Sequence, residues 1–249
     1  MSDRATGKLQ GQVAIVTGGS RGIGQAVALA FAREGASVAV AAAHGQTALR
    51  NVEQEISALR SRALAVIADV TRRAEIDRLV QKVVESWGRI DVLVNNAGIL
   101  RPAPLESITE EQWDEMMAVH LKGTFHCTQA VLPIMKRQRR GKIINVTAPS
   151  ALRGSFGVAD YAAAKGGIIA FTRNAANELK PYNIQVNCIS PVADTRMTEV
   201  LTAFRRQHLG ELPGQHRFVS PDAIAPVFVF FAGSDSDYIT GQTLEISRP

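Results

Sequence analysis

Short apolar runs alternate with amphipathic helical patterns along most of this 249-residue chain. In one helical pattern, Ile76, Val80 and Val83 recur at the three- and four-residue spacing of a single helix face. Apolar strands separated by helices predict a parallel sheet covered by helices on both faces, an α/β doubly wound fold of about seven strands. The length suits a single domain, residues 1–249. The expected strands are residues 13–16, 38–43, 63–68, 90–94, 142–147, 184–189 and 244–246.

The composition is that of an ordinary globular protein, with 46% apolar and 20% charged residues and a net charge of +5. The densest basic segment, KRQRR at 136–140, is typical of a solvated helix end; the alternative is a patch for an anionic partner. Aromatic residues do not interrupt this segment, and the sequence contains no DNA-binding motif. We therefore expect no nucleic-acid partner.

The cysteines and the N-terminal segment indicate a cellular compartment. Cys127 and Cys188 lie in apolar contexts without metal-ligand spacing, so we expect buried free thiols and no bound metal. The segment MSDRATGKLQ does not resemble a signal peptide. No apolar run approaches the roughly 18 residues that a membrane-spanning helix requires. These features predict a cytoplasmic protein without a membrane partner.

A glycine-rich segment, VTGGSRGIG at 16–24, follows the first expected strand and opens the first expected helix. Glycines at such a turn allow a pyrophosphate to approach the backbone, and the helix N-terminus offers free N–H groups. Tight turns also need glycine, so the pattern alone is weak. The strand before it and the helix after it supply the context that a nucleotide-binding site requires.

Later motifs complete a pattern that extends over nearly the whole chain. Asp69-Val70 follows the third run, NNAG at 95–98 follows the fourth, YxxxK spans 161–165, and YITGQ occupies 238–242. With the TGxxxGIG spacing, these motifs resemble the short-chain dehydrogenase/reductase family. The resemblance extends to 3-oxoacyl-ACP reductases and the hydroxyacyl-CoA dehydrogenase branch. It implies a Rossmann-type fold, a nicotinamide cofactor, a small carbonyl or hydroxyl substrate, and a homotetramer or homodimer.

The cofactor site expected from this resemblance and from the glycine-rich turn draws on several segments. Asp69 and Val70 are expected to contact the adenine, and 96–98 to line its ribose. Thr195 is expected near the nicotinamide amide. The full expected set is Gly18, Ser20, Arg21, Ile23, Gly24, His44, Asp69, Val70, Asn96, Ala97, Gly98, Tyr161, Lys165, Pro191, Val192 and Thr195.

The end of the second strand bears on the choice between NAD(H) and NADP(H). An acidic residue there usually binds the ribose 2′-hydroxyl, but no Asp or Glu occurs between Glu34 and Glu53. A 2′-phosphate would therefore meet no carboxylate. Arg21 can pair with that phosphate, and His44 can assist. The sequence favours NADP(H) over NAD(H).

Tyr161 and Lys165 are four residues apart and therefore share one face of a helix. A nearby ammonium favours the tyrosinate and lowers the pKa of the phenol. Such a tyrosine can exchange a proton with a substrate oxygen while hydride moves to or from the nicotinamide. By the resemblance, the lysine also holds the nicotinamide ribose. Asp160 is expected to be a helix-start or surface acid.

The family normally places a serine thirteen residues before this tyrosine, where it polarises the substrate oxygen. Here that position is Ala148, which has no side-chain donor. Loss of one such donor typically costs about 10²–10³ in rate. Along an extended segment Ser150 would share the direction of position 148, while Thr147 would face away. Ser150 is the favoured replacement donor, Thr147 is a second candidate, and the absence of any replacement is a third possibility.

His120 lies in MMAVHLKGTF, where many family members carry asparagine and use it to help a water chain reach the lysine. Histidine can also donate and accept hydrogen bonds. VHLKGTF and SPVADTRMTE resemble the hydroxyacyl-CoA dehydrogenase branch, which makes His120 a feature of that branch. The alternative is a histidine that only packs helices.

The leading hypothesis is an oxidoreductase that interconverts a ketone and a secondary alcohol, with 3-oxoacyl/3-hydroxyacyl thioesters as a plausible substrate class. Ala148 keeps two alternatives open: a catalytically impaired cofactor-binding subunit, and a dehydratase or isomerase with the same fold. Residues 194–219 are expected to form a substrate loop. The segment GELPGQHRFVS at 210–220, which overlaps the end of this loop, breaks the periodicity and is either a mobile lid or a simple connection.

Overall fold

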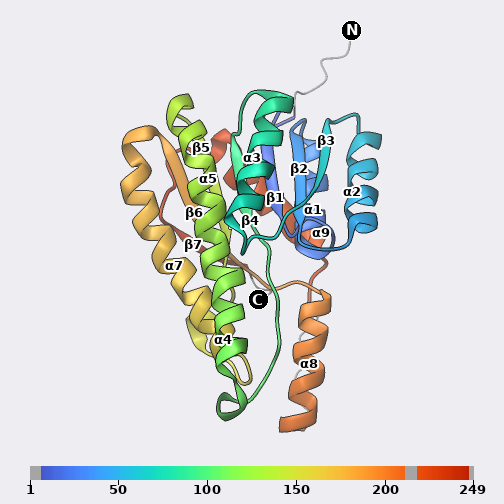
Figure 1. Ribbon diagram of the computed structural model, residues 1–249, viewed down its shortest axis with the longest axis vertical. Helices are drawn as coiled ribbons and strands as arrows, with labels where there is room; N and C mark the ends of the chain where they lie inside the picture. The colour runs from blue at the N-terminus through green and yellow to red at the C-terminus, as the bar shows by residue number, and fades with distance from the viewer. Residues whose placement is uncertain (1–6, 211–217, 247–249) are drawn as a thin grey trace.

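A computed structural model describes residues 7–210 and 218–246. In this part of the chain, seven strands form one sheet in the order β3-β2-β1-β4-β5-β6-β7, and every pairing is parallel (Figure 1). The predicted doubly wound α/β fold is confirmed. The strands are β1 (Val13–Thr17), β2 (Ser37–Ala42), β3 (Ala63–Ile67), β4 (Val92–Asn95), β5 (Gly141–Val146), β6 (Ile184–Pro191) and β7 (Thr243–Ile246).

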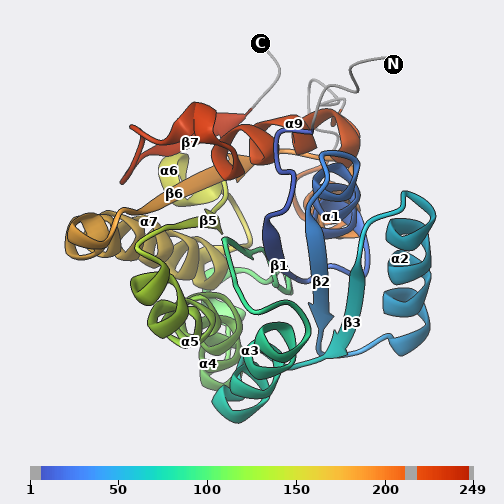
Figure 2. The ribbon, with the colours of Figure 1, turned by 90° about the horizontal axis from the view of Figure 1, so that it is seen from above.

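Helices cover both faces of the sheet (Figure 2). One apolar cluster joins the sheet to α1, α2 and α9, and a second cluster joins it to α3, α5 and α7. Phe31 of α1 and Phe228 of α9 are both fully buried in the first cluster. The helices are α1 (Gly22–Arg33), α2 (Gln46–Ala58), α3 (Arg73–Trp87), α4 (Glu110–Met117), α5 (Gly123–Gln138), α6 (Ser150–Arg153), α7 (Ala159–Leu179), α8 (Arg196–Leu209) and α9 (Pro221–Ala232).

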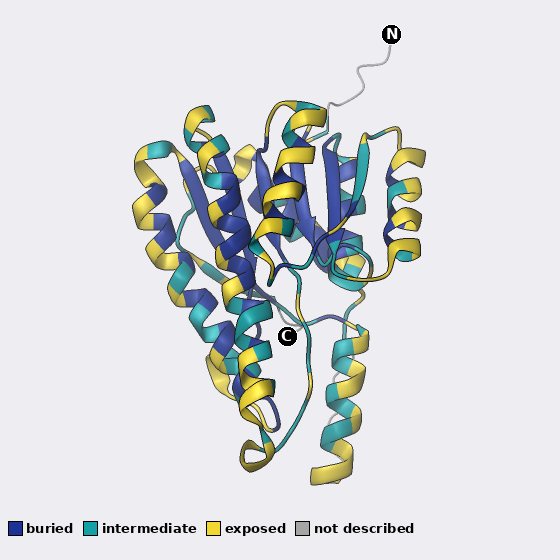
Figure 3. Cartoon of the chain, in the orientation of Figure 1, coloured by how far each residue is buried: buried dark blue, intermediate teal, exposed yellow. Residues whose placement is uncertain are grey.

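The central strands are buried along their whole length, which is why they are apolar runs instead of alternating patterns (Figure 3). Parallel pairing brings their carboxyl ends to one edge of the sheet. Thr17, Asn95 and Val146 end three neighbouring strands there. Ligands of open α/β sheets bind beyond this edge.

The expected substrate loop at 194–219 is largely a helix, so that prediction is wrong for its first part. Thr195 caps α8 by a reciprocal capping box with Thr198, and Gly210 ends the helix with φ +76°. No glycine or proline interrupts Arg196–Leu209, so a helix can form once it is capped. Residues 211–217, within the segment expected to be a lid or connection, lie outside the described residues.

None of the helices in the described ranges 7–210 and 218–246 is long and apolar enough to cross a membrane. Among the same residues, no group of histidine, cysteine and acidic side chains could hold a metal ion. Cys127 and Cys188 are free and buried, as expected from their apolar contexts.

Candidate active site

The glycine-rich turn between β1 and α1 packs directly on the segment after β4. Gly18 has φ +64°, and a Cβ there would lie 2.9 Å from the Ala97 Cα. A Cβ on Gly24 would lie 2.2 Å from the Gly18 carbonyl oxygen. Real Cβ atoms do not come this close to backbone, so glycine is required at both positions. The turn thus presents bare backbone at the carboxyl edge of the sheet.

Side-chain hydrogen bonds fasten the two segments together. Thr17 Oγ1 accepts from the backbone N–H groups of Asn96 and Ala97, both at 3.1 Å. Asn96 Nδ2 donates to the carbonyl oxygens of Thr17 at 3.0 Å and Gly18 at 3.2 Å. This Asn96 contact fixes the turn, a structural task that the NNAG motif alone did not reveal.

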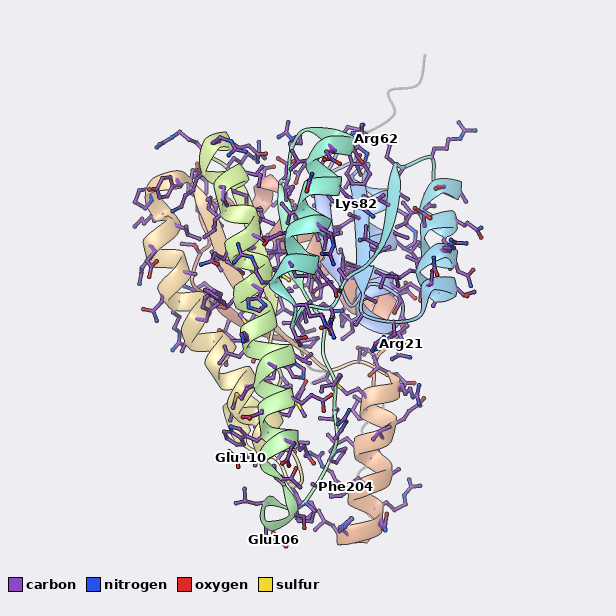
Figure 4. The ribbon with its side chains drawn as sticks, in the orientation of Figure 1. Arg21, Arg62, Lys82, Glu106, Glu110 and Phe204 are labelled. Carbon is purple, nitrogen blue, oxygen red and sulfur yellow. The ribbon has the colours of Figure 1, made fainter. Side chains whose placement is uncertain are left out.

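The N-terminus of α1 is open to an anion. Its N-cap residue, Arg21, makes no side-chain cap, and the first turn carries no acidic residue. The free N–H groups and the positive end of the helix dipole therefore remain available to a ligand. Arg21 is exposed and lies at the edge of the sheet that faces α8 (Figure 4). Ser20 and Ile23 beside it are half-buried, and His44 is exposed just beyond β2.

The segment after β3 is held by its own hydrogen bonds and by α5. Asp69 Oδ1 accepts from Thr71 N at 2.9 Å and from Thr71 Oγ1 at 2.8 Å. The Val70 carbonyl oxygen lies 2.9 Å from His126 Nδ1. The sequence prediction missed His126, which is buried on α5. Its position in VHLKGTFHC, six residues after His120, was the available signal.

Tyr161 and Lys165 lie in the first two turns of α7, beside the end of β5. Lys165 is 3% exposed, and its Nζ donates to the Val146 carbonyl oxygen at 2.7 Å. The same Nζ lies 5.6 Å from the centre of the half-buried Tyr161 ring. The structure therefore brings the predicted pair together at the edge where parallel sheets bind ligands.

Burial dominates the titration of both side chains. It raises the pKa of the Tyr161 phenol, opposite to the direction that we predicted from the lysine alone. It lowers the pKa of Lys165 from 10.5 to about 8, because the buried ammonium loses its hydration. The lysine thus titrates close to neutrality while the tyrosine remains a proton donor.

The region of the missing serine differs from its predicted geometry. β5 ends at Val146 and Ser150 begins α6, so strand alternation does not extend to Ser150. Thr147 Oγ1 donates to the Lys165 carbonyl oxygen at 2.9 Å and is thereby occupied. Ala148 is buried, and the Oγ of Ser150 is buried without a hydrogen-bond partner among the described residues.

His120 is buried in a π-helical turn, Ala118–Lys122, between α4 and α5. Its Nε2 lies 2.8 Å from the Ile99 carbonyl oxygen and 3.2 Å from the Ile99 nitrogen. Its ring meets the Tyr161 ring edge-on, with 5.0 Å between centres. Its Nδ1 has no partner among the described residues. Burial, reinforced by the Lys165 charge, lowers the pKa of His120 and keeps the ring neutral.

The close fit of His120 depends on Gly98. A Cβ on Gly98 would lie 2.5 Å from His120 Cε1. The last residue of the NNAG motif therefore makes room for the histidine ring. This contact joins the segment after β4 to the environment of Tyr161.

The remaining predicted residues end or follow β6, which pairs in parallel with β5 and so reaches the same edge of the sheet. β6 ends at Pro191, and Val192 follows it. Thr195 lies beside the glycine-rich turn, because a Cβ on Gly22 would be 3.6 Å from Thr195 Cγ2. α8 therefore starts next to the expected cofactor site.

Asp160 is a helix-start acid, one of the two roles predicted for it, and it is buried and not on the surface. It lies in the first turn of α7 but is only 1% exposed. Its carboxylate accepts from Tyr161 N at 2.7 Å and from Gln112 Nε2 at 3.0 Å. The carboxylate therefore connects the start of α7 to α4.

Comparison with known proteins gives a consistent result. The family model for short chain dehydrogenase matches residues 12–206. The 3-oxoacyl-[acyl-carrier-protein] reductase of Thermotoga maritima is 42% identical over 246 residues, covering 96% of this chain and 97% of that protein. The (2S)-[(R)-hydroxy(phenyl)methyl]succinyl-CoA dehydrogenase subunit of Thauera aromatica is 37% identical over 239 residues, 96% of each chain.

Solved structures show the same architecture. The carveol dehydrogenase of Mycobacterium avium in complex with NAD superposes with a TM-score of 0.90 at 27% identity, covering 97% of this chain and 98% of that one. An NAD⁺-bound xylitol dehydrogenase gives a TM-score of 0.88 at 32% identity, covering 96% of this chain and 99% of that one.

Proposed function

Because this chain belongs to the short chain dehydrogenase family, we propose that it is an NADP(H)-dependent oxidoreductase interconverting a ketone and a secondary alcohol. The observation that carries the proposal is the placement of Tyr161 and Lys165. Lys165 Nζ donates to the Val146 carbonyl oxygen at the end of β5, and its charge faces the Tyr161 ring. We propose that residues 1–249 form one dinucleotide-binding domain, with 194–219 next to the substrate.

The chain's own backbone supports a dinucleotide site. Gly18 and Gly24 leave no room for side chains in the turn, and the α1 N-terminus is uncapped by any side chain. In the proposed site these groups hold the pyrophosphate, Asp69 and Val70 contact the adenine, and 96–98 line its ribose. Pro191, Val192 and Thr195 hold the nicotinamide end. When bound, the nicotinamide supplies or accepts the hydride.

We assign the proton to the Tyr161 hydroxyl. Since burial raises the pKa of this phenol, it is protonated at neutral pH and can donate to a substrate oxygen during ketone reduction. Lys165, whose pKa is about 8, returns a proton to the tyrosinate and holds the nicotinamide ribose. His120 takes the place of the family's asparagine, and its unpartnered Nδ1 offers a hydrogen bond to a water leading to Lys165.

Ser150 is the proposed replacement for the missing serine. Its buried Oγ lacks a partner, and an unsatisfied buried hydroxyl is costly unless a ligand or water completes it. Thr147 is the weaker candidate, because its hydroxyl hydrogen already points to the Lys165 carbonyl oxygen. A substrate oxygen bound by Tyr161 and Ser150 would accept two hydrogen bonds, as it does from the tyrosine and serine that the family normally carries.

The cofactor and substrate classes are inferred from different observations. Arg21 is exposed beside the turn, and no carboxylate follows β2, which supports NADP(H) over NAD(H). Two of the similar structures contain NAD, so the affinities of this protein for NADPH and NADH must be compared directly. The curated relatives named above act on acyl-carrier-protein or CoA thioesters, which supports a 3-oxoacyl or 3-hydroxyacyl thioester as substrate. We also propose a homo-oligomer, a tetramer or dimer, which light scattering would measure.

Ala148 favours a second candidate, a cofactor-binding subunit with impaired chemistry of its own. One relative is itself named as a subunit of a dehydrogenase. This candidate predicts NADPH binding with negligible oxidation until a partner chain is added. A dehydratase or isomerase is the third candidate, and it would form product without net consumption of cofactor.

One experiment separates these candidates. The purified protein and Ala148→Ser are compared over a panel of 3-oxoacyl thioesters and simple ketones, with NADPH and with NADH. Measurable reduction by the unaltered protein supports the proposal. Cofactor binding without turnover, followed by a gain of about 10²–10³ in Ala148→Ser, favours the impaired subunit.

A further inference from the structure

An aromatic cluster joins the segment 194–219, proposed to lie next to the substrate, to a residue that has no role assigned so far. It consists of Phe156, from the segment between α6 and α7, with Phe204 and His208 from α8. The rings of Phe156 and Phe204 stack with 5.9 Å between centres and 22° between planes. The ring centres of Phe204 and His208 are 4.2 Å apart. The cluster thus connects α8 to the segment that leads into the Tyr161 helix.

The backbone at Gly157 is shaped to receive the Phe204 ring. Gly157 has φ +78°, and a Cβ there would lie 2.3 Å from Phe204 Cε1. Its carbonyl oxygen accepts from Ala103 N at 3.0 Å, which ties this backbone to the segment after β4. Arg205 adds hydrogen bonds to the Ser155 side chain and to the Phe156 carbonyl oxygen. Phe204 therefore sits against fixed backbone, not in open solvent.

α8 connects this cluster to the cofactor turn. The N-cap residue of α8, Thr195, lies beside Gly22, and Phe204 follows nine residues later, about 14 Å along the axis. At the other side, Gly157 precedes Tyr161 by four residues. Figure 4 shows Phe204 between α8 and α4, toward the end of α8 that is remote from the sheet. The cluster consequently joins the far end of α8 to the backbone just before the Tyr161 helix.

α6, α8 and the segment between α6 and α7 each expose an apolar side chain. Val200 and Phe204 are four residues apart, so they share one face of α8. Val200 is 42% exposed, Leu152 of α6 is 47% exposed, and Phe156 is 41% exposed. Exposed apolar side chains that gather near a site typically contact an apolar part of a ligand.

We infer that Phe204 is a specificity-determining residue that limits the length of the apolar group carried by the substrate. Short apolar groups fit between the reactive end and the Phe204 ring. Longer ones must displace that ring from its place against Gly157. The inference deepens the proposed function, since it rests on the substrate entering beside Tyr161.

Binding is measured separately from turnover, so that the two proposals can fail independently. Saturated acyl thioesters of N-acetylcysteamine, with four or twelve carbons, are titrated calorimetrically with and without NADP⁺. The proteins compared are the unaltered chain, Phe204→Ala, Phe204→Leu and the control Gln207→Ala, whose residue is exposed on the same helix. Circular dichroism confirms that each is folded.

We expect Phe204→Ala to bind the twelve-carbon thioester at least about tenfold more tightly, with the four-carbon affinity nearly unchanged. Phe204→Leu should show a smaller gain, and Gln207→Ala none. An unchanged ratio of the two affinities in both Phe204 variants overturns the inference, as does a failure of every protein to bind either thioester. A gain in affinity without reduction of any 3-oxoacyl thioester contradicts the proposed function only.

Discussion

The cofactor end and the reactive end of this site are built in different ways. At the cofactor end, the Thr17 hydroxyl accepts from the Asn96 backbone, and the Asn96 side chain donates to the carbonyl oxygens of Thr17 and Gly18. The glycines of the turn leave the backbone uncovered by side chains. At the reactive end, His120 Nδ1 and Ser150 Oγ are buried without partners. The cofactor end therefore offers backbone N–H groups to a ligand, whereas the reactive end offers buried side-chain atoms to a ligand or water. Binding and chemistry should therefore be separable by mutation.

Tyr161→Phe should show the largest difference between its effect on turnover and its effect on cofactor binding. Removal of the hydroxyl eliminates the proton donor, so we expect turnover to fall by about 10²–10⁴. The ring and its edge-on contact with His120 are retained, and the cofactor dissociation constant should change little. Single-turnover kinetics and fluorescence titration of NADPH measure the two quantities. An equal loss of cofactor affinity would mean that the two ends are not separate.

Ser150→Ala tests the replacement donor. If its Oγ holds the substrate oxygen, kcat should fall by about 10²–10³ while the cofactor affinity stays the same. Ser57→Ala, which removes an exposed hydroxyl from α2, is the control. A kcat within twofold of the unaltered protein would remove Ser150 from the mechanism and leave either Thr147 or no residue in place of the missing serine.

The two ends also differ in how far the sequence predicts them. The strands and the turn follow from continuous apolar runs and from glycine spacing, which depend on local sequence. Ser150 does not follow, because strand alternation was assumed for residues that the structure places in α6. The direction of the Tyr161 pKa was missed because burial depends on elements far apart in the chain. The buried setting of Asp160 likewise depends on Gln112 in α4, and the capped helix α8 occupies residues expected to form a loop.

Lys165→Met tests whether burial lowers the pKa of Lys165 at the reactive end. The folded-state pKa is about 8 and the ordinary value is 10.5, so between these values the unfolded chain binds more protons. The stability of the unaltered protein should therefore rise relative to Lys165→Met across about pH 8 to 10.5. The slope is at most about 1.4 kcal/mol per pH unit, reaching roughly 3 kcal/mol in all.

Urea unfolding of both proteins from pH 7 to 10.5 measures this difference. Titration of Cys127 and Tyr161 contributes to both chains and largely cancels, whereas the Lys165 charge lowers the pKa of Cys188, which burial raises to about 11, at the upper end of this range. The buried ammonium destabilises the unaltered protein most below pH 8, where it is fully charged. A difference in unfolding free energy that stays constant with pH would show that Lys165 is not desolvated as the structure indicates.

Arg21→Ala should have the smallest effect, because this side chain is exposed and its charge is screened by water and salt. If Arg21 pairs with a 2′-phosphate, its loss should weaken NADPH binding by about tenfold and leave NADH binding unchanged. Arg33→Ala is a matched control, because it removes an exposed arginine from the opposite end of α1, about 18 Å away. Because only NADPH carries the additional phosphate, the ratio of the two affinities isolates this contact from any general loosening of the turn. Equal weakening of both cofactors would assign Arg21 to the turn itself, and tighter NADH binding by the unaltered protein would reverse the cofactor preference.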